Sequence, residues 1–393
     1  MRLKKLLTRH IIDILGWKTP EKIVVIESDD WGSIRMPSGE VYNNLLRQGY
    51  SVEKDPFLKY DSLACESDLI NLMEVLSSVK DKNGDHAKMT LNTVMVNPDF
   101  DKIRGCDYQE YHYELFTETL AKYRSHNGSF PLWQEGIRKK LFHPQFHGRE
   151  HINIDRWMQA LQKKDKNIIE AFKHNMISIS SEPLGMTYGY MEALDYYSHK
   201  EKENKLVILK DGLDLFQKLF GYCSRSFMGN CFIWDDEMEE TLHDKGVEYI
   251  QGIVLQFKPK IKKEKHGYKK IFHYTGQKNA LGQTYLVRNA AFEPCLNGAY
   301  DVVDTCLKEI GLAFRFHTPA VISAHRLNFI GNIVPENRDL NLKSFKRLLN
   351  EIIKRWPDIQ FMFSDELGDK IRDKSSSLKT KGSYENSANK HIG

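Results

Sequence analysis

The chain has 393 residues, of which 41% are hydrophobic and 28% charged, and its 57 Lys and Arg residues nearly balance its 53 Asp and Glu residues. This much apolar material excludes a disordered or fibrous protein, and the small net charge of +4 argues against a dedicated nucleic-acid-binding protein. The sequence has no uninterrupted run of roughly 18–20 apolar residues, so it predicts no membrane-spanning helix.

Residues 1–19 mix basic side chains with leucines and isoleucines. Thr8, Arg9, His10 and Asp13 interrupt the apolar run and no small-residue cleavage site follows, so no signal peptide is evident. We expect an amphipathic helix that packs on the body of the protein, with contact to a membrane surface or a partner as the alternative. The six cysteines form no closely spaced pair, which, together with the missing signal peptide, favours the cytoplasm.

Short apolar runs of strand length recur along the chain, and most of them end in polar residues. The first covers residues 22–26 and is followed by Glu27-Ser28-Asp29-Asp30. The others cover residues 89–96, 140–146, 176–180, 226–233, 247–253, 320–324 and 359–363. Segments with helical spacing of apolar residues lie between them, for example at 67–80 and 342–356. This alternation predicts a parallel α/β fold, either a barrel or a doubly wound sheet, with its functional site where the strands end.

Two segments depart from this alternation. Residues 258–270 contain seven lysines between two apolar runs, which predicts a β-hairpin with a basic tip. A solvated surface hairpin is the simpler interpretation, and contact with an acidic polymer is the alternative. Residues 375–393 are rich in Ser, Lys and Asn, so we expect a disordered tail.

Two consecutive carboxylates, Asp29 and Asp30, directly follow the first strand. Because adjacent side chains at a strand end point in different directions, one carboxylate can ligate a cation while the other faces a substrate as a general base. Two aspartates shortly before a glycine are also ordinary in turns and helix caps, which is the alternative interpretation.

Three histidines, His143, His147 and His151, are spaced four residues apart. If a helical turn begins at Gly148, His147 and His151 share a face and can converge on one cation. Pro144 disfavours a helix through all three histidines, so His143 is assigned to the preceding strand. One Asp and two His leave an open coordination position, as a catalytic zinc site requires.

A further histidine, His325, follows the apolar run at 320–324. An imidazole with a pKa near neutrality can protonate a leaving group. A single histidine at such a place is more often structural. Here three groups, each just past a strand, would meet where the strand ends converge.

Taken together, these motifs resemble the NodB-type polysaccharide deacetylases of the glycoside hydrolase/deacetylase superfamily, of which the chain would be a divergent member. The resemblance covers residues 20–370 in pattern and keeps the order of the family's motifs. It implies a distorted (β/α)7-8 barrel of parallel strands with insertions near 36–85 and 256–284, the second being the basic hairpin. The N-terminal helix and the tail flank this barrel.

The resemblance also implies the roles of five residues. Asp30, His147 and His151 would bind a divalent metal, most simply Zn²⁺. Asp29 would be the general base, and His325 would be the general acid that protonates the leaving amine.

Other parts of the family pattern are changed in this chain. Trp31 precedes the glycine of the first motif, and Gly148 replaces the usual Ser or Thr of the second. The arginine of the third motif corresponds to Arg225, which is the expected partner of Asp29. For the substrate, we expect Trp31 and Trp234 to stack on sugar faces and Arg288 and Asn289, with Glu293 beside them, to contact hydroxyl groups. Core aromatics and a structural ion pair are the alternatives for these residues.

The function implied is that of a metal-dependent hydrolase that removes N-acetyl or O-acetyl groups from a polysaccharide or oligosaccharide. Its partners would be a carbohydrate substrate and no nucleic acid. One alternative is a glycoside hydrolase of the same superfamily, with Asp29 paired with Asp235, Asp236 or Glu182 across the scissile bond. Another is a non-catalytic carbohydrate-binding barrel.

Overall fold

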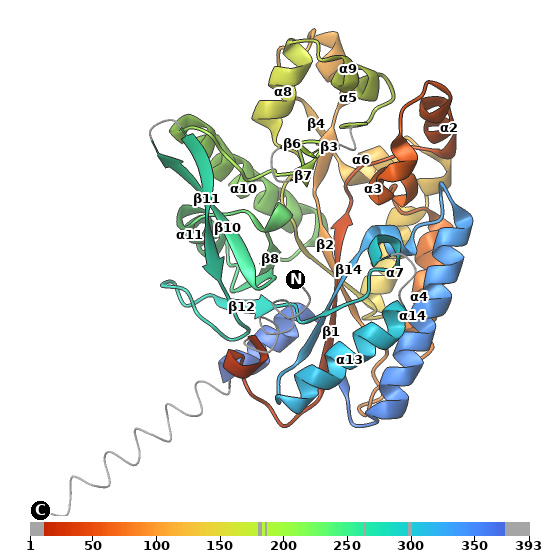
Figure 1. Cartoon of the computed structure of the whole chain (residues 1–393), viewed down its shortest axis with the longest axis vertical. Coiled ribbons are helices and arrows are strands. Elements are labelled where there is room, and N and C mark those ends of the chain that lie inside the picture. The colour runs from red at the N-terminus through yellow and green to blue at the C-terminus, as the bar shows by residue number, and fades with distance from the viewer. Residues whose placement is uncertain (1–11, 180–182, 185–186, 263–264, 298–300, 374–393) are drawn as a thin grey trace, which may run out of the picture.

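The computed structural model describes residues 12–179, 183–184, 187–262, 265–297 and 301–373. Its centre is a sheet of nine strands, and helices cover the outside of this sheet (Figure 1). All pairings within this sheet are parallel, which confirms the predicted parallel α/β fold.

The strands of the central sheet, in spatial order, are β12 (Thr284–Val287), β9 (Tyr249–Gly252), β8 (Ser226–Met228), β5 (Phe142–Phe146), β2 (Met89–Thr93), β1 (Ile23–Trp31), β14 (Ala320–His325) and β13 (Ala290–Ala291), with β15 (Gln360–Met362) paired to β1. Three two-stranded sheets are formed by β3 (Val96–Pro98) with β4 (Tyr113–Leu115), β6 (Pro183–Leu184) with β7 (Thr187–Tyr188), and β10 (Leu255–Lys262) with β11 (Lys265–Phe272).

The α-helices are α2 (Gly39–Arg47), α3 (Pro56–Tyr60), α4 (Glu66–Ser77), α5 (Phe100–Gly105), α6 (Phe116–Ala121), α7 (Ser129–Arg138), α8 (Ile154–Gln162), α9 (Lys166–Lys173), α10 (His199–Phe220), α11 (Asp236–Asp244), α12 (Pro294–Asn297), α13 (Val302–Arg315) and α14 (Pro335–Arg355). Short 3₁₀ helices are η1 (Val52–Lys54), η2 (Arg124–His126), η3 (Asn230–Phe232) and η4 (Arg326–Phe329). The helical segments predicted at 67–80 and 342–356 correspond to α4 and α14.

The two ends of the sheet order, β12 and β13, belong to one short run of chain. Only Arg288 and Asn289 separate them, and the backbone N–H of Arg288 donates to Gly252 in β9 while that of Asn289 donates to Val321 in β14. The run from 284 to 291 therefore pairs with one neighbour in its first half and with the other in its second half. The sheet returns on itself through this run, which gives a barrel with a seam at Arg288–Asn289.

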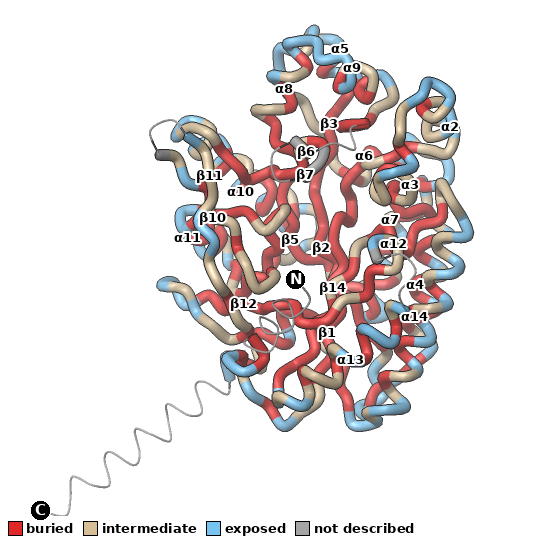
Figure 2. Tube along the Cα trace, viewed as in Figure 1, coloured by how far each residue is buried: buried red, intermediate tan, exposed pale blue. Residues whose placement is uncertain are grey.

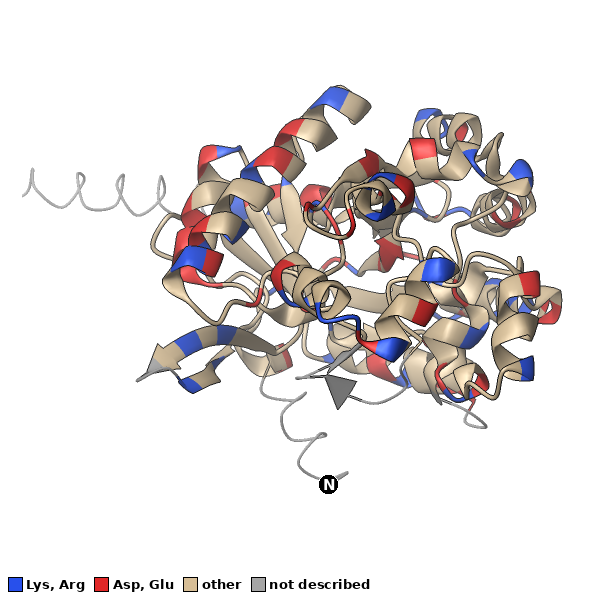
Figure 3. Ribbon diagram, turned by 90° about the horizontal axis from the view of Figure 1, so that it is seen from above, with Lys and Arg blue, Asp and Glu red and all other residues tan. Residues whose placement is uncertain are grey.

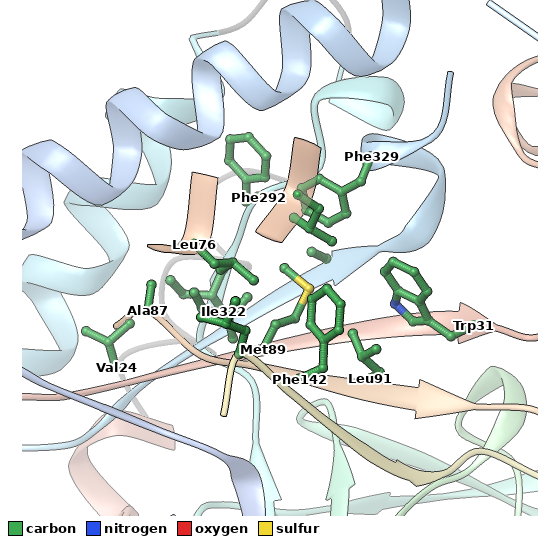
Figure 4. Packing of buried hydrophobic residues seen from close by; sticks show 14 of the residues in the cluster. Val24, Trp31, Leu76, Ala87, Met89, Leu91, Phe142, Phe292, Ile322 and Phe329 are labelled. Carbon is green, nitrogen blue, oxygen red and sulfur yellow. The ribbon is translucent and has the colours of Figure 1, made fainter. Parts of the chain in front are cut away.

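The core lies between the sheet and the surrounding helices. All nine residues of β1 are buried, as a strand flanked on both sides and covered by helices must be (Figure 2). Val24, Met89, Phe142 and Ile322 belong to one large apolar cluster (Figure 4). Burying a side chain of this size contributes roughly 1.5–3 kcal/mol, so this cluster dominates the stability of the barrel.

One predicted strand, at 176–180, is wrong. Met176 to Ile179 are buried but form no strand, and residue 180 lies outside the described residues. The backbone N–H of Met176 donates to Ala171, and the carbonyl of Ile177 accepts a hydrogen bond from the indole of Trp157. These partners replace a neighbouring strand, so the apolar side chains mark a buried loop here.

The predicted basic hairpin is confirmed as β10 and β11, with residues 263–264 at its tip outside the described residues. The register pairs Lys258 with Lys269, so these two lysines share one face of the ribbon. Blue bands mark the lysines along the hairpin in Figure 3. The other face carries His266 and Tyr268, whose side chains bond to Asp195 on the body of the protein. The hairpin is thus docked mainly by this face, and its other face carries lysines, of which Lys258 pairs with Asp236.

The two ends of the chain are only partly described. Of the helix predicted over 1–19, residues 1–11 lie outside the described residues, and residues 12–15 are helical. The whole predicted tail, 375–393, also lies outside the described residues. Among the residues that the structure describes, none of the helices is both long and apolar enough to span a bilayer.

Candidate functional site

The site lies at the carboxyl end of β1, where the strand carries a bulge. Pairing of β1 with β2 shifts register between Ser28 and Trp31, and Asp30 has a φ of 71°. In a regular strand consecutive side chains point to opposite faces, whereas a bulged residue with left-handed backbone re-aims its side chain. The irregularity therefore gives Asp29 and Asp30 different partners within one site.

Asp30, His147 and His151 converge within the barrel. Nε2 of His147 and Nε2 of His151 lie 3.5 and 3.2 Å from Oδ1 of Asp30, and all three side chains are buried. Burial would raise the pKa of Asp30, but His151, His147 and Arg35 outweigh it and hold that pKa well below its usual range. Burial lowers the pKa of His151, more strongly than Asp30 raises it, so this imidazole is neutral as a metal ligand must be.

The position of the proton on His147 indicates which kind of ligand can bind between the three side chains. Nδ1 of His147 lies 2.7 Å from the carbonyl oxygen of Met228, which can only accept, so Nδ1 carries the proton. Nε2 of His147 then faces Oδ1 of the Asp30 carboxylate at 3.5 Å, with Nε2 of His151 3.2 Å from the same oxygen. A carboxylate oxygen and two imidazole nitrogens gathered this closely in a buried site suit a cation held between them. This donor set therefore fits a divalent metal ion, with one carboxylate oxygen and two imidazole nitrogens as ligands.

The histidines are not on a helical turn, contrary to expectation. Residues 147–151 form a loop, and Gly148 has a φ of 101°. A Cβ at Gly148 would lie 2.6 Å from Oδ1 of Asn230, whose side-chain amide donates to the carbonyl of His147. Glycine here allows both the backbone turn and the approach of Asn230, and the turn brings His151 back toward His147.

Asp29 is held by an arginine that the motifs did not indicate. Arg288 donates to both carboxylate oxygens of Asp29 at 2.6 and 2.7 Å, and its Nε donates to Glu27 at 2.6 Å. The side-chain amide of Asn92 also donates to Asp29, at 2.7 Å. Burial alone would raise the pKa of Asp29, but Arg288 outweighs it and keeps that pKa below its usual range. Asp29 is therefore ionised and rigidly oriented.

Arg225, the expected partner of Asp29, lies elsewhere. Its guanidinium bonds to Glu248 and Asp369 in a cluster that is about one-third exposed. Arg225 precedes β8, whereas the catalytic groups lie at the carboxyl ends of their strands, so Arg225 lies at the opposite end of the barrel. The correction is that Arg288, placed at the seam of the barrel, supplies the guanidinium.

His325 ends β14 directly beside Asp29, with which it is paired in register. Its Nε2 lies 3.9 Å from Oδ2 of Asp29, and its Nδ1 lies 2.7 Å from Oε1 of Glu293. Burial lowers the pKa of His325, but the Glu293 carboxylate outweighs this and raises the pKa to about 10. Glu293 is itself oriented by the amide of Asn328 at 2.7 Å. His325 is therefore protonated at neutral pH and can donate a proton.

A cavity of about 280 Å³ lies over these groups, and Asp29, Asp30, His147, His151 and His325 all line it. The remaining lining residues are Ile34, Arg35, Asp55, Phe57, Leu58, Ile177, Ser178, Gly189, Met191, Met228, Gly229, Cys231 and Phe232. The structure thus brings together, in one cavity, five of the residues predicted from sequence.

The residues expected to contact the substrate do not line this cavity. Trp31 packs against Trp133 and Phe142 in the core, as Figure 4 shows for Trp31 and Phe142, and Trp234 donates its indole N–H to Glu239. Both tryptophans are only 1% exposed. Arg288 forms ion pairs with Asp29 and Glu27, and Asn289 accepts a hydrogen bond from the backbone of β14. Core aromatics and a structural ion pair, given above as alternatives, describe these positions.

Two residues of the site, Arg35 and Asn92, were not predicted from sequence, and Glu293 was expected beside the substrate instead of in contact with His325. Arg35 places its guanidinium 3.5 Å from Asp30, Glu293 holds His325, and Asn92 holds Asp29. Asn92 and Glu293 each lie near a strand terminus, as the predicted site residues do, which is the signal that could have found them. Nothing in the sequence marks Arg35, which belongs to the loop after β1.

No protein-family model and no curated protein sequence matches the chain. Among solved structures, it is similar to 4-alpha-glucanotransferase from Thermococcus litoralis (11% identity, 89% of this chain and 40% of that one, TM-score 0.44). It is also similar to a protein described as a polysaccharide deacetylase from Mycobacterium smegmatis (9%, 92% and 93%, 0.44). A third is Puue allantoinase (10%, 89% and 90%, 0.44). At these values the likeness supports no conclusion about this chain, and the function proposed below rests on the residues of the site.

Proposed function

We propose that the protein is a metal-dependent hydrolase that removes acyl groups, N-acetyl or O-acetyl in the simplest case, from a carbohydrate. The observation that carries this proposal is the meeting of a metal-ligand triad, an ionised carboxylate and a protonated imidazole in one cavity. Asp30, His147 and His151 fit a divalent cation, most simply zinc. Asp29 and His325 then lie beside it as base and acid.

Each catalytic residue would act through one particular side-chain atom. A bound divalent cation lowers the pKa of water and polarises a carbonyl oxygen, which is the chemistry it supplies here. Oδ2 of Asp29 lies 3.9 Å from Nε2 of His325 and accepts one hydrogen bond, from Arg288, whereas Oδ1 accepts two; Oδ2 would receive the proton of the attacking water. Nε2 of His325 would deliver a proton to the leaving amine, while Glu293 keeps the ring oriented through Nδ1.

Arg288 has a positioning role in this scheme. Its two hydrogen bonds fix the plane of the Asp29 carboxylate, and the buried positive charge keeps it ionised between turnovers. This strong pairing also makes Asp29 a weak base. The reaction therefore depends on water of lowered pKa, which a metal at the neighbouring triad is suited to provide.

The alternative of a two-carboxylate glycoside hydrolase finds less support. Asp235 caps α11 and bonds to Tyr196 and Lys202 instead of facing the cavity, and Asp236 pairs with Lys258. Glu182 lies outside the described residues. A non-catalytic carbohydrate-binding barrel would need neither the ionised Asp29 nor the protonated His325.

The first experiment tests the metal. Purified full-length protein should contain about one divalent ion per chain, and the His147→Ala/His151→Ala variant should contain none. His143→Ala is the matched control, because His143 is a histidine on the adjacent strand that bonds to Asp365 and lies outside the triad. Wild-type protein that holds no divalent ion after incubation with zinc would overturn the proposal.

The second experiment tests the reaction. Zinc-loaded wild-type protein should release acetate from N-acetylated oligosaccharides, and Asp29→Asn should lower kcat by about 10²–10⁴-fold, the usual contribution of a general base. Reducing-end formation without acetate would instead support the glycoside hydrolase.

A further inference from the structure

The cavity over the site has two chemically different sides. On one side, Phe57 packs edge-on against His325 with ring centroids 5.6 Å apart, and Arg35 stacks over the same phenyl ring. On the other side lie the histidines of the triad, next to the segments 189–191 and 228–232. The carbonyl of Met228 binds His147, and the carbonyl of Tyr190 accepts from the backbone N–H of Asn153, two residues beyond His151.

The histidine side is walled by apolar groups. We call it the apolar wall, and its residues are Ile34, Ile177, Met191, Met228, Cys231 and Phe232. Ile34, Ile177 and Met191 belong to one buried cluster, against which Cys231 packs, and each of these three is at most 6% exposed. The wall is therefore a preformed part of the core that faces the cavity.

Polar side chains around the cavity are few. Among the described lining residues outside the catalytic groups, only Ser178, Arg35 and Asp55 carry hydroxyl or charged groups. Arg35 pairs with Asp30 and Asp61 and also contacts Sδ of Met191 at the edge of the wall, and Asp55 accepts the N–H of Phe57 as the cap of α3. A sugar ring needs several hydrogen-bond partners for its hydroxyl groups, and the apolar wall does not provide them.

The direction of amide hydrolysis determines which part of the substrate faces each side of the cavity. Hydrolysis adds water to the amide carbonyl carbon and breaks the C–N bond, which leaves the acyl group as a carboxylate and the amine as an ammonium. The amine must depart toward the proton donor, His325. The acyl group then extends away from His325, toward the histidines and the apolar wall.

We propose that the apolar wall binds an acyl chain longer than acetyl, so that the substrate is an N-acylated sugar carrying a medium-length alkyl chain. This inference rests on the proposed function and specifies its substrate class. A methyl group alone would leave most of the wall facing water, whereas each further methylene buried there contributes about fourfold in affinity.

The test uses the product carboxylates as probes, which needs no turnover. Acetate, butanoate, hexanoate and octanoate are titrated into the zinc-loaded full-length protein by calorimetry. We expect the affinity to rise by about threefold to fourfold per methylene until the wall is covered. An affinity that is flat, or that falls beyond acetate, overturns the inference.

A matched pair of variants locates the effect. Ile177→Phe fills the cavity from the wall and should reduce the gain of octanoate over acetate by at least tenfold. Ile179→Phe introduces the same change two residues along the same segment, in a different buried cluster that does not line the cavity, and should keep the full gain. If both variants lose this gain in affinity equally, or if neither variant loses it, the assignment of the wall is contradicted.

A parallel assay separates this inference from the function on which it rests. N-acetyl-, N-hexanoyl- and N-octanoylglucosamine are compared in kcat/KM for release of the free amine. Faster release from the longer amides supports the inference. Release from the acetyl compound alone overturns the inference and keeps the proposed hydrolase. Chain-length-dependent carboxylate binding with no amine released from any compound overturns the hydrolase while the wall remains a site for alkyl chains.

Discussion

Two adjacent aspartates behave differently because each has its own buried partners. Asp29 is clamped by Arg288 and Asn92, whereas Asp30 faces His147 and His151. A buried carboxylate that loses its only cation is left as an uncompensated charge, which is far more costly than losing an exposed ion pair. The site is therefore sensitive to changes in residues that never touch a substrate.

The first prediction concerns Arg288. Arg288→Gln leaves Asp29 and the fully buried Glu27 without their cation, so we expect a loss of about 3–5 kcal/mol in the free energy of unfolding. Arg225→Gln is the matched control, because its partners Glu248 and Asp369 are about one-third exposed, and it should cost at most about 1 kcal/mol. Urea unfolding measures both values, and equal losses would contradict the different environments of the two arginines.

The second prediction concerns the pH dependence set by His325. Its pKa is raised from the ordinary 6.5 to about 10, so its contribution to stability is fully present below about pH 6.5 and is lost as the pH rises through about 10. Glu293→Gln removes the carboxylate and should lower this pKa toward 6.5, since a neutral His325 can accept from the new amide. NMR titration of the imidazole measures the pKa.

Urea midpoints at several pH values complete this prediction. Between pH 6.5 and 10, the stability of Glu293→Gln should fall less than that of the wild type, because the variant has less of this contribution to lose. Parallel curves for the two proteins would show that Glu293 does not hold the proton on His325.

The residues of the site differ in how far sequence could locate them. Asp29, Asp30, His147 and His325 directly follow apolar runs, and the carboxyl ends of parallel strands meet, so their proximity could be predicted. The partner of Asp29 could not be predicted. Arg288 lies 259 positions away in sequence, at the seam of the barrel, and only the pairing of the strands shows that this arginine contacts Asp29.

At the scale of elements, the hairpin of β10 and β11 joins the barrel to the segment that forms the cavity. The buried carboxylate of Asp195 accepts hydrogen bonds from Nε2 of His266 at 2.8 Å and from the hydroxyl of Tyr268 at 2.6 Å. Asp195 is four residues from Met191, which lines the cavity. The lysine face points away from these contacts, and one of its lysines, Lys258, pairs with Asp236 of α11.

The third prediction tests this docking. Tyr268→Phe removes one hydrogen bond to a buried carboxylate and should cost about 1.5–3 kcal/mol, with faster amide hydrogen exchange in β10 and β11. Lys269→Gln, on the exposed face next in the chain, should change stability by no more than about 0.5 kcal/mol. Unchanged exchange in Tyr268→Phe would show that the hairpin does not depend on Asp195.

Periodicity predicted most elements but misassigned one. Apolar runs at 22–26 and 320–324 became β1 and β14, because each has a neighbouring strand on both sides. The run at 176–180 also contains buried apolar residues, but its backbone bonds to other partners. The N–H of Met176 donates to Ala171 in α9, and the carbonyl of Ile177 accepts from Trp157. A short apolar run shows that a segment is buried, and only its backbone partners decide whether it is a strand.

At the scale of the whole molecule, the barrel depends on how its seam is closed. Asn289 makes three side-chain hydrogen bonds there: it accepts from the N–H of Val321 and donates to Asp13 and to the carbonyl of Pro319. It thereby ties the seam to β14 and to the N-terminal segment. The neighbouring Arg288 belongs to the same segment and extends into the barrel. This segment therefore both closes the barrel and orients Asp29.

The last prediction follows from this coupling. Asn289→Ala leaves two backbone groups and Asp13 with fewer partners in a buried region, so we expect a loss of about 2–4 kcal/mol in the free energy of unfolding. Asn350→Ala, on the exposed side of α14, removes a single bond to Lys346 and should change stability by at most about 0.5 kcal/mol. Because one apolar cluster extends from Ile12 to Phe361, fluorescence and circular dichroism should report the same urea midpoint in both variants. Separate midpoints for Asn289→Ala would mean that the seam opens while the rest of the barrel stays folded.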